Sequence, residues 1–339
     1  MNEKNIVNRQ IGAVRGIDYW EALLAQDPKN LKPLFDAPHE KSERIADFAR
    51  NVAIINLETS AACNRVCDYC PDALFDRKKQ LLLPPDLWAR FKDNVRELGF
   101  GHQISLNLYN EPMMDPTIFD KISELREASG GVVLKISSNG DFINRKSLER
   151  LSEAGLDLAY VTLHAPARSE YRDDRQAGYF RKFFKRCEVA PPSNLEMVPG
   201  DRISATFEVG RTKVQVFSKN WGKFGNDRAG TVISLSKIKP RSAPCMRVFR
   251  EFTISHLGQV FPCCQFFPDA ESSQKHSLGS IQDMDLWDIY FSEKAQAWRR
   301  SLFDFSYKAR PCDTCNDPDN AVQESSNVRQ RVLAGFGAR

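Results

Sequence analysis

Three cysteines within eight residues constrain this chain more than any other feature. Residues 63–70 read CNRVCDYC, a CxxxCxxC spacing that places three thiols on one loop. Such a group can hold one metal centre. Zinc at a structural site normally takes four protein ligands, and the nearest histidines, His39 and His102, are far away in sequence. A four-iron cluster on Cys63, Cys67 and Cys70, with one iron left open, fits better, and zinc stays the alternative.

Composition predicts the compartment and excludes some partners. The chain has 339 residues, 42% of them hydrophobic and 27% charged, as in ordinary globular proteins. Its N-terminus is polar with no apolar stretch behind it, and no run approaches the ~18 apolar residues of a membrane span. A net charge of +4, without a basic run or an aromatic–basic stripe, indicates neither nucleic acid nor a membrane as partner. We therefore expect a cytoplasmic protein.

The nine cysteines are then expected to be reduced thiols, because the cytosol disfavours disulfides. They are strongly grouped along the chain. Besides the first loop, Cys245, Cys263 and Cys264 follow much later, and Cys312 and Cys315 come near the end, whereas Cys187 stands alone. Grouped cysteines in a cytosolic chain indicate metal binding or catalysis.

Strand-like and helix-like segments alternate through the first half of the chain, which predicts βαβ units and a parallel sheet. The expected strands are 51–58, 103–109, 132–138 and 156–164, and the expected helices are 84–98, 116–128, 145–154 and 171–187. Polar loops follow these strands at 63–70, 109–112, 137–140 and 162–164. Because the carboxyl ends of parallel strands share one edge, these loops should converge on an active site.

The alternation weakens after residue 191. Segments 203–209 and 212–217 are both strand-like but are separated by two residues, too few for a parallel crossover, so we expect an antiparallel hairpin. From about residue 241 the chain is loop-rich and contains cysteines. The sequence thus predicts a helical extension (1–50), an α/β domain (51–240), a small cysteine-rich domain (241–320) and a polar tail (321–339).

The first cysteine loop, with the aromatic Tyr69 before its last cysteine and a strand before its first, resembles the radical S-adenosylmethionine (SAM) superfamily. This resemblance implies a partial (β/α)6 barrel and a [4Fe–4S] cluster whose open iron binds SAM. It also implies reductive cleavage of SAM to a 5′-deoxyadenosyl radical that abstracts hydrogen from substrate. A reductant such as flavodoxin or ferredoxin would supply the electron.

Two further segments match that family's SAM-binding positions. Asn110 and Glu111 stand where the family has a Gly-Gly-Glu-Pro-like segment that holds the SAM amino group, although Tyr109-Asn110 replaces the two glycines. Ser137, Ser138 and Asn139 stand where the family contacts the SAM ribose and carboxylate. The alternative for each segment is a simple capping or turn motif.

The second cysteine set resembles the auxiliary-cluster domain of SPASM and Twitch radical SAM enzymes. Cys245 and Cys263 bracket Gly258 with that domain's spacing, and residues 312–315 form a CxxC. A full SPASM domain carries seven cysteines, and fewer remain here. The resemblance therefore implies the Twitch form, with one auxiliary [4Fe–4S] cluster on Cys245, Cys263, Cys312 and Cys315, and a zinc-ribbon-like site is the alternative.

Two residues are candidates for catalysis. Arg228 lies in a stretch that resembles the Asn-Arg-x-Gly segment preceding the auxiliary domain, where an arginine could hold a substrate oxygen; an ordinary turn is the alternative. Cys264 adjoins a predicted cluster ligand and could donate a hydrogen atom to a substrate radical. Cys187 is a second candidate donor, and a buried bystander is the alternative for both.

Several functions remain open. The first is two-electron oxidation of an alcohol on a small molecule, such as a sugar, an aminocyclitol or a related natural product, as in the aminocyclitol dehydrogenases that the chain resembles. The others are a redox-neutral epimerase with a cysteine donor, a maturase of ribosomally made peptides, and a non-catalytic zinc-dependent interaction protein. Only 62 residues precede Cys63, barely enough for the peptide-recognition domain of many maturases.

Overall fold

The computed structural model describes residues 32–77, 81–236, 240–303 and 305–317. The expected tail and most of the expected N-terminal extension lie outside these residues. The strands are β1 (Ile54–Leu57), β2 (Gln103–Ser105), β3 (Val133–Ser138), β4 (Leu158–Thr162), β5 (Glu196–Val198), β6 (Arg202–Val209), β7 (Thr212–Lys219), β8 (Glu251–Ile254), β9 (Gln259–Phe261) and β10 (Gly279–Ser280). The helices are α4 (Lys41–Asn51), α5 (Pro85–Leu98), α6 (Ile118–Ala128), α7 (Arg145–Glu153), α8 (Asp173–Arg186), α9 (Trp221–Phe224), α10 (Arg247–Arg250), α11 (Glu271–Gln274), α12 (Leu286–Tyr290) and α13 (Glu293–Leu302). Single 3-10 turns occur at Lys32–Leu34, Pro71–Ala73, Pro112–Met114 and Ile233–Leu235.

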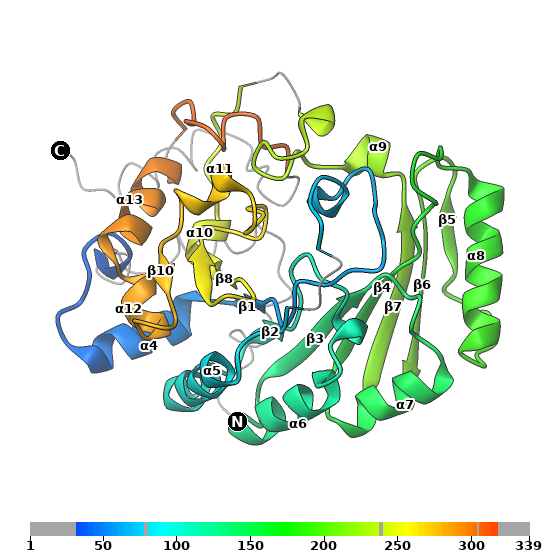
Figure 1. Cartoon of the computed structure of the whole chain (residues 1–339), viewed down its shortest axis with the longest axis horizontal. Helices are drawn as coiled ribbons and strands as arrows, with labels where there is room; N and C mark the ends of the chain where they lie inside the picture. The colour runs from blue at the N-terminus through cyan, green and yellow to red at the C-terminus, as the bar shows by residue number, and fades with distance from the viewer. Residues whose placement is uncertain (1–31, 78–80, 237–239, 304, 318–339) are drawn as a thin grey trace.

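Within the described residues all the strands belong to one sheet, in the order β10-β9-β8-β1-β2-β3-β4-β7-β6-β5. The six central strands, from β8 to β7, are mutually parallel. Helices α5, α6 and α7 each connect one parallel strand to the next, and they lie around the outside of the sheet (Figure 1). The predicted α/β class with a parallel sheet is confirmed.

Local sequence signals fix the ends of these helices. Helix α5 begins with Pro85, whose missing N–H costs nothing in the first turn, and ends at Gly99 in the left-handed conformation (φ 55°). Helix α7 begins with a capping box in which Asn144 and Ser147 satisfy each other's backbone N–H groups. These signals fix the points at which the chain leaves α5 and enters α7.

The predicted hairpin is present. Strands β6 and β7 are antiparallel from Arg202–Lys219 to Val209–Thr212, with Gly210 in the turn (φ 56°). Strand β7 also pairs in parallel with β4, so the hairpin extends the sheet and supplies its next parallel strand.

The cysteine-rich segment after residue 241 does not form a sheet of its own. Its first strand, β8, pairs in parallel with β1, and β9 and β10 continue the same sheet outward. One continuous sheet therefore includes strands from both sides of the domain boundary that we expected near residue 240. Because β1 leads directly into the first cysteine loop, this pairing fixes the two cysteine-bearing regions next to each other.

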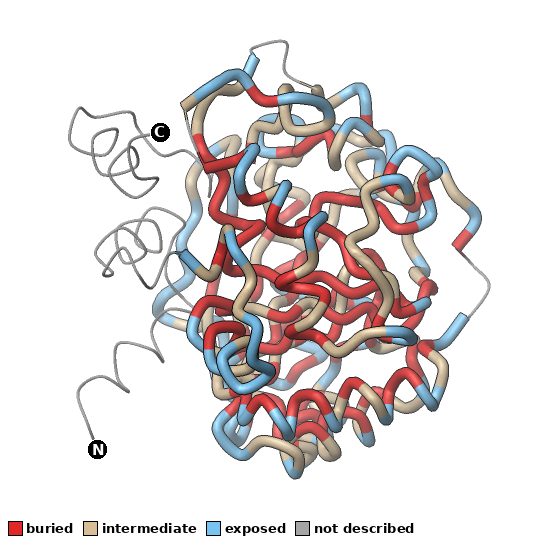
Figure 2. The backbone as a smooth tube through the Cα atoms, turned by 90° about the vertical axis from the view of Figure 1, so that its left-hand side faces the viewer, coloured by how far each residue is buried: buried red, intermediate tan, exposed pale blue. Residues whose placement is uncertain are grey.

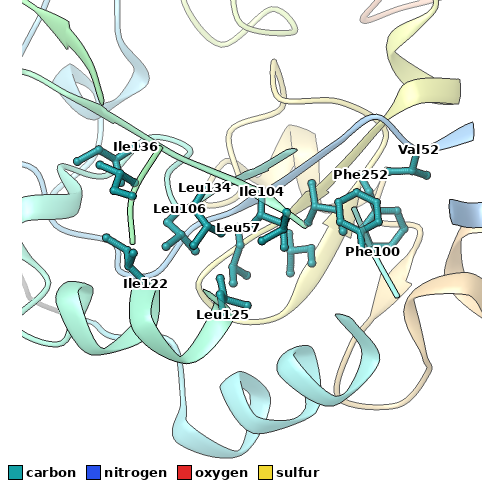
Figure 3. Packing of buried hydrophobic residues seen from close by; sticks show 14 of the residues in the cluster. Val52, Leu57, Phe100, Ile104, Leu106, Ile122, Leu125, Leu134, Ile136 and Phe252 are labelled. Carbon is teal, nitrogen blue, oxygen red and sulfur yellow. The ribbon is translucent and has the colours of Figure 1, made fainter. Parts of the chain in front are cut away.

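The main core lies between the sheet and the helices that cover it. Leu57, Ile104 and Leu134 of the strands gather near Leu125 of α6, whereas Phe252 lies beside Phe100 (Figure 3). Most strand residues are buried, and the exposed residues lie in loops and on the outer faces of helices (Figure 2). None of the helices in the described ranges combines the length and the apolar character needed to cross a membrane.

Candidate active site

A cavity of about 290 Å³ lies at the carboxyl ends of the parallel strands, where the loops after β1, β2, β3 and β4 meet. Its walls bring together many of the residues expected from the sequence: Cys63, Cys67, Tyr69, Cys70, Asn110, Glu111, Ser137, Ser138, Asn139, Arg228 and Cys264. The predicted convergence of polar loops on one edge is thus observed. Cys245, Cys263, Cys312 and Cys315 do not line this cavity and lie together elsewhere.

The first cysteine loop is held in place by its neighbours. The N–H of Cys70 donates to the carbonyl of Cys67 (2.9 Å), and the N–H of Glu111 donates to the carbonyl of Ala62, just before the loop (2.8 Å). Burial raises the pKa of Cys63 to about 12, so a cationic metal centre is what would stabilise its thiolate there. Three free thiols around one cavity fit a cluster that takes one thiolate per iron. In the described part of the chain, no three His, Cys, Asp or Glu side chains form a group that could hold a single metal ion.

Glu111 joins the loops after β2 and β3. Its carboxylate accepts hydrogen bonds from the Ser138 hydroxyl (2.8 Å), the Asn139 N–H (2.7 Å) and the Met113 N–H (3.1 Å). Burial raises the pKa of Glu111 to about 7, against these three donors. A carboxylate has about four acceptor positions, so one remains for a ligand. Glu111 therefore positions Ser138 and Asn139 as well as facing the cavity.

Asn139 connects the loop after β3 to the cysteine loop. Its side-chain amide donates to Asn64 (2.6 Å), and Asn64 in turn donates to Asp141 (2.7 Å). Arg65 also donates to Asp141, through Nε at 2.8 Å. These contacts hold the residues between Cys63 and Cys67 against the end of β3.

Three aromatic side chains that no sequence pattern indicated as a group line one side of the cavity. The Tyr69 hydroxyl lies 2.5 Å from Nδ1 of His164, and the Tyr69 ring stacks on Trp221 (centroids 5.0 Å apart, 21° between planes). Burial lowers the pKa of His164 to about 4, and Arg65 adds to this, so the imidazole is neutral near pH 7. His164 follows an expected strand and could have been found from that position. Trp221 had no signal of its own.

The opposite wall is built by residues of the C-terminal half. The Tyr109 hydroxyl donates to the backbone carbonyls of Cys264 (3.1 Å) and Gln265 (3.0 Å). Arg228 donates to the Gln265 side chain (2.9 Å), and its backbone is left-handed (φ 52°), held by an N–H bond to Asn226 (2.9 Å). Both predicted catalytic residues, Arg228 and Cys264, thus border the cavity. Cys187 is fully buried in the main core, away from it.

The four remaining grouped cysteines lie close enough to influence one another. Burial raises the pKa of Cys312, and the nearby thiols of Cys245 and Cys315 raise it further. Burial also raises the pKa of Cys263, and the nearby thiols of Cys264 and Cys245 raise it further. Asn226, next to the Arg228 turn, approaches Cys315 (3.8 Å). The donor set is all-thiol, which suits the larger iron–sulfur cluster; in the described residues no three of these thiols form a group that could hold a single ion such as zinc.

Comparison with known proteins gives two family matches. Residues 57–197 match the radical SAM superfamily, and residues 245–316 match the SPASM iron–sulfur cluster-binding domain; together these cover more than half of the chain. The fold and the two cysteine-bearing sites define a radical SAM enzyme. The chain belongs to the radical SAM superfamily and carries a SPASM-type domain. These domains imply a [4Fe–4S] cluster, SAM, and auxiliary iron–sulfur binding.

The chain is also similar to individual proteins. It is 24% identical over 275 residues to the S-adenosyl-L-methionine-dependent 2-deoxy-scyllo-inosamine dehydrogenase of Niallia circulans, a match covering 80% of this chain and 96% of that relative. The crystal structure of BtrN in complex with AdoMet and 2-DOIA has the same fold (TM-score 0.60, 23% identity, 80% and 96% covered). An open conformation of BtrN gives a TM-score of 0.52 at 20% identity, over 80% of this chain and 98% of that one.

Proposed function

We propose that this protein oxidises an alcohol carbon of a small polar molecule, such as a sugar or an aminocyclitol, to a ketone in the cytoplasm. One observation carries this proposal. Cys264 lines the same cavity as Cys63, Cys67 and Cys70, while its neighbour Cys263 belongs to the second cysteine set. A substrate in the cavity would therefore lie between the two cysteine-bearing sites. The dehydrogenase name of the relative from Niallia circulans supports the same reaction.

We propose one set of residues for each bound group. Cys63, Cys67 and Cys70 would bind the first [4Fe–4S] cluster, and Cys245, Cys263, Cys312 and Cys315 the auxiliary one. SAM would lie against Tyr69, Asn110, Glu111, Ser137, Ser138 and Asn139. When bound, the first cluster supplies the electron that cleaves SAM to methionine and a 5′-deoxyadenosyl radical.

The overall reaction balances as a two-electron oxidation. One hydrogen atom would leave the alcohol carbon and become part of 5′-deoxyadenosine, and the hydroxyl proton would go to solvent or a base. The remaining electron would pass to the auxiliary cluster, held by Cys245, Cys263, Cys312 and Cys315. Arg228 would hold a substrate oxygen, because its guanidinium borders the cavity and one of its nitrogens is already fixed by Gln265. The stacked Tyr69 and Trp221 rings would keep water away from that side.

The test is anaerobic reconstitution followed by incubation with SAM, dithionite and 2-deoxy-scyllo-inosamine as the first probe. Formation of 5′-deoxyadenosine without any substrate tests the radical SAM chemistry alone. A ketone product in a 1:1 ratio with substrate-dependent 5′-deoxyadenosine supports the oxidation. If other aminocyclitols and sugars also give no ketone, alcohol oxidation of this substrate class is wrong.

A second candidate, a redox-neutral epimerase, is favoured by the position of Cys264. This residue lines the cavity in which a substrate radical would form, and its sulfur accepts a hydrogen bond from Nη1 of Arg247 (3.4 Å). In that reaction the thiol would return a hydrogen atom to carbon, the resulting thiyl radical would take up one electron from the reductant and one proton, and no ketone would accumulate.

A further inference from the structure

The outer side of the first cysteine loop is exposed and apolar at its centre. Val66, directly before Cys67, is 48% exposed, and Asn64 and Asp68 on either side of it are exposed too. The chain therefore brings solvent within one or two residues of two predicted cluster ligands. A protein that delivers an electron to this site would find its shortest route here.

Basic side chains surround this exposed loop. A second cavity, of about 280 Å³, adjoins the first and shares Arg65, Asn139 and His164 with it. Its outer wall is one face of α8, which presents Lys182 and Arg186 four residues apart.

Arg168 adds a further cation on the other side of the loop. It is exposed, and its backbone N–H donates to the Asp68 carboxylate on the cysteine loop. Cations from two segments after β4 thus lie beside the same eight residues.

The segment around these residues is basic. Residues 165–187 contain seven Lys or Arg and three Asp or Glu, a local excess of four. Two of the neighbouring acids bind other arginines: Asp141 binds Arg65, and Asp174 binds Arg172. Among the described residues no carboxylate lies within 4.0 Å of the Arg168 or Lys182 side chains. This leaves the Arg168 and Lys182 side chains available to an acidic partner.

We propose that Val66, Arg168, Lys182 and Arg186 form the docking surface for an acidic one-electron donor protein of the flavodoxin type; this inference rests on the proposed function. An apolar centre with a charged rim suits the small, transient interfaces of electron-transfer partners. Complementary charge raises the association rate and makes it sensitive to salt. In each encounter the flavin hydroquinone of the donor is oxidised to the semiquinone and gives one electron to the first cluster.

The test compares two electron sources on the reconstituted holoenzyme. SAM cleavage is followed as 5′-deoxyadenosine, driven either by flavodoxin with NADPH and flavodoxin reductase or by dithionite. For the double variant Arg168→Glu/Lys182→Glu, we expect the flavodoxin concentration at half-maximal rate to rise about tenfold and its salt dependence to flatten. The dithionite-driven rate should stay within about twofold of wild type.

Lys213→Glu is the matched control, because Lys213 is exposed at the amino end of β7, opposite the cysteine loop. It should leave both rates unchanged. Equal losses in Lys213→Glu and the double variant, or none in either, would overturn the docking site.

A binding measurement separates this inference from the proposed function. Titration with oxidised flavodoxin, followed by FMN fluorescence, should show about tenfold weaker binding for the double variant, with no turnover needed. If wild type gives no 5′-deoxyadenosine with dithionite, the radical SAM function fails, whereas unchanged flavodoxin binding in the double variant makes the docking inference wrong by itself.

Discussion

Arg77 donates hydrogen bonds from both terminal nitrogens to the carboxylate of Glu58, at 2.8 and 3.0 Å, and both side chains are buried. Glu58 comes directly after β1, whereas Arg77 follows the first cysteine loop. The same carboxylate lies 2.9 Å from Nδ1 of His256, just after β8, and the Arg77 Nε donates to Asp269 (2.7 Å). This buried cluster therefore fixes the cysteine loop to both the first strand and the auxiliary domain.

Arg77→Met should destabilise the fold strongly, because it leaves the Glu58 carboxylate buried without its main partner. We expect a loss of about 3–5 kcal/mol in the free energy of unfolding, measured by urea denaturation. Arg96→Met is the control: its partner Asp93 and Arg96 itself are 71% and 61% exposed, and such pairs contribute about 0–1 kcal/mol. Equal effects of the two substitutions would mean that burial of the Glu58 pair does not matter.

The same pair predicts a pH dependence. Although burial opposes ionisation, Arg77 and His256 together lower the pKa of Glu58 from 4.5 to about 2. A carboxyl group whose pKa is lowered by folding stabilises the fold above its unfolded pKa and loses that contribution as pH falls. Wild type should therefore lose stability between about pH 4.5 and 2, and Arg77→Met should lose less in that window. The other carboxyl groups are common to both proteins, so identical slopes would contradict the prediction.

The sequence predicted what local patterns determine. The alternation of strands and helices, the 203–217 hairpin and the position of the cysteine loop all follow from periodicity or spacing over a few residues. Long-range pairing was not predictable in this way. The pairing of β8 with β1 joins residues about 200 positions apart, and it continues the sheet into a region that was expected to form a separate domain.

In the candidate site, too, the sequence indicated individual residues but not the contacts between distant segments. Glu111, Ser138 and Asn139 were expected as SAM contacts because they stand at positions that resemble the SAM-binding segments of the radical SAM family, but their hydrogen bonds to one another come only from the fold. The Tyr69–Trp221 stack also joins distant segments, so no local pattern indicated it. Strand β2 ends at Ser105 rather than Tyr109. Beyond it, the N–H groups of Leu108 and Tyr109 donate to side chains, those of Asn110 and Glu58 (both 3.1 Å), instead of to a neighbouring strand.

Gly140→Ala should distort the loop after β3. Gly140 has φ +81°, and an added Cβ would lie 2.8 Å from Val161 and 3.2 Å from Leu163. We expect a loss of about 1–3 kcal/mol in stability together with weaker SAM binding, because the adjacent Asn139 would move. Gly130→Ala, at an exposed position with no heavy atom within 4 Å of the added Cβ, should change neither quantity. Urea denaturation and SAM titration check both; a tolerant Gly140 would mean that this loop is not fixed.

The two cysteine sets should be separable by substitution. Reconstituted wild type should hold about eight irons, as two [4Fe–4S] clusters do. Cys67→Ala should hold about four and form no 5′-deoxyadenosine. Cys312→Ala should also hold about four irons but keep cleaving SAM, because Cys312 does not line the cavity in which SAM would bind. Iron analysis and EPR spectroscopy of the reduced proteins check this, and stoichiometric zinc in place of iron at either site would show the assignment of that site to be wrong.

Cys264 decides between oxidation and epimerisation. If the thiol returns a hydrogen atom to substrate, Cys264→Ala should still form 5′-deoxyadenosine but lose the epimeric product, and turnover in D2O should place deuterium in the product of wild type only. If the reaction is an oxidation, Cys264→Ala should keep forming ketone, because the electron leaves through the auxiliary cluster and no hydrogen atom returns. Cys187→Ala is the control, since Cys187 is buried in the core and should affect stability alone. Either outcome can be interpreted, because Cys264→Ala removes only the sulfur from the cavity wall. The backbone carbonyl of residue 264, which accepts a hydrogen bond from the Tyr109 hydroxyl, stays in place.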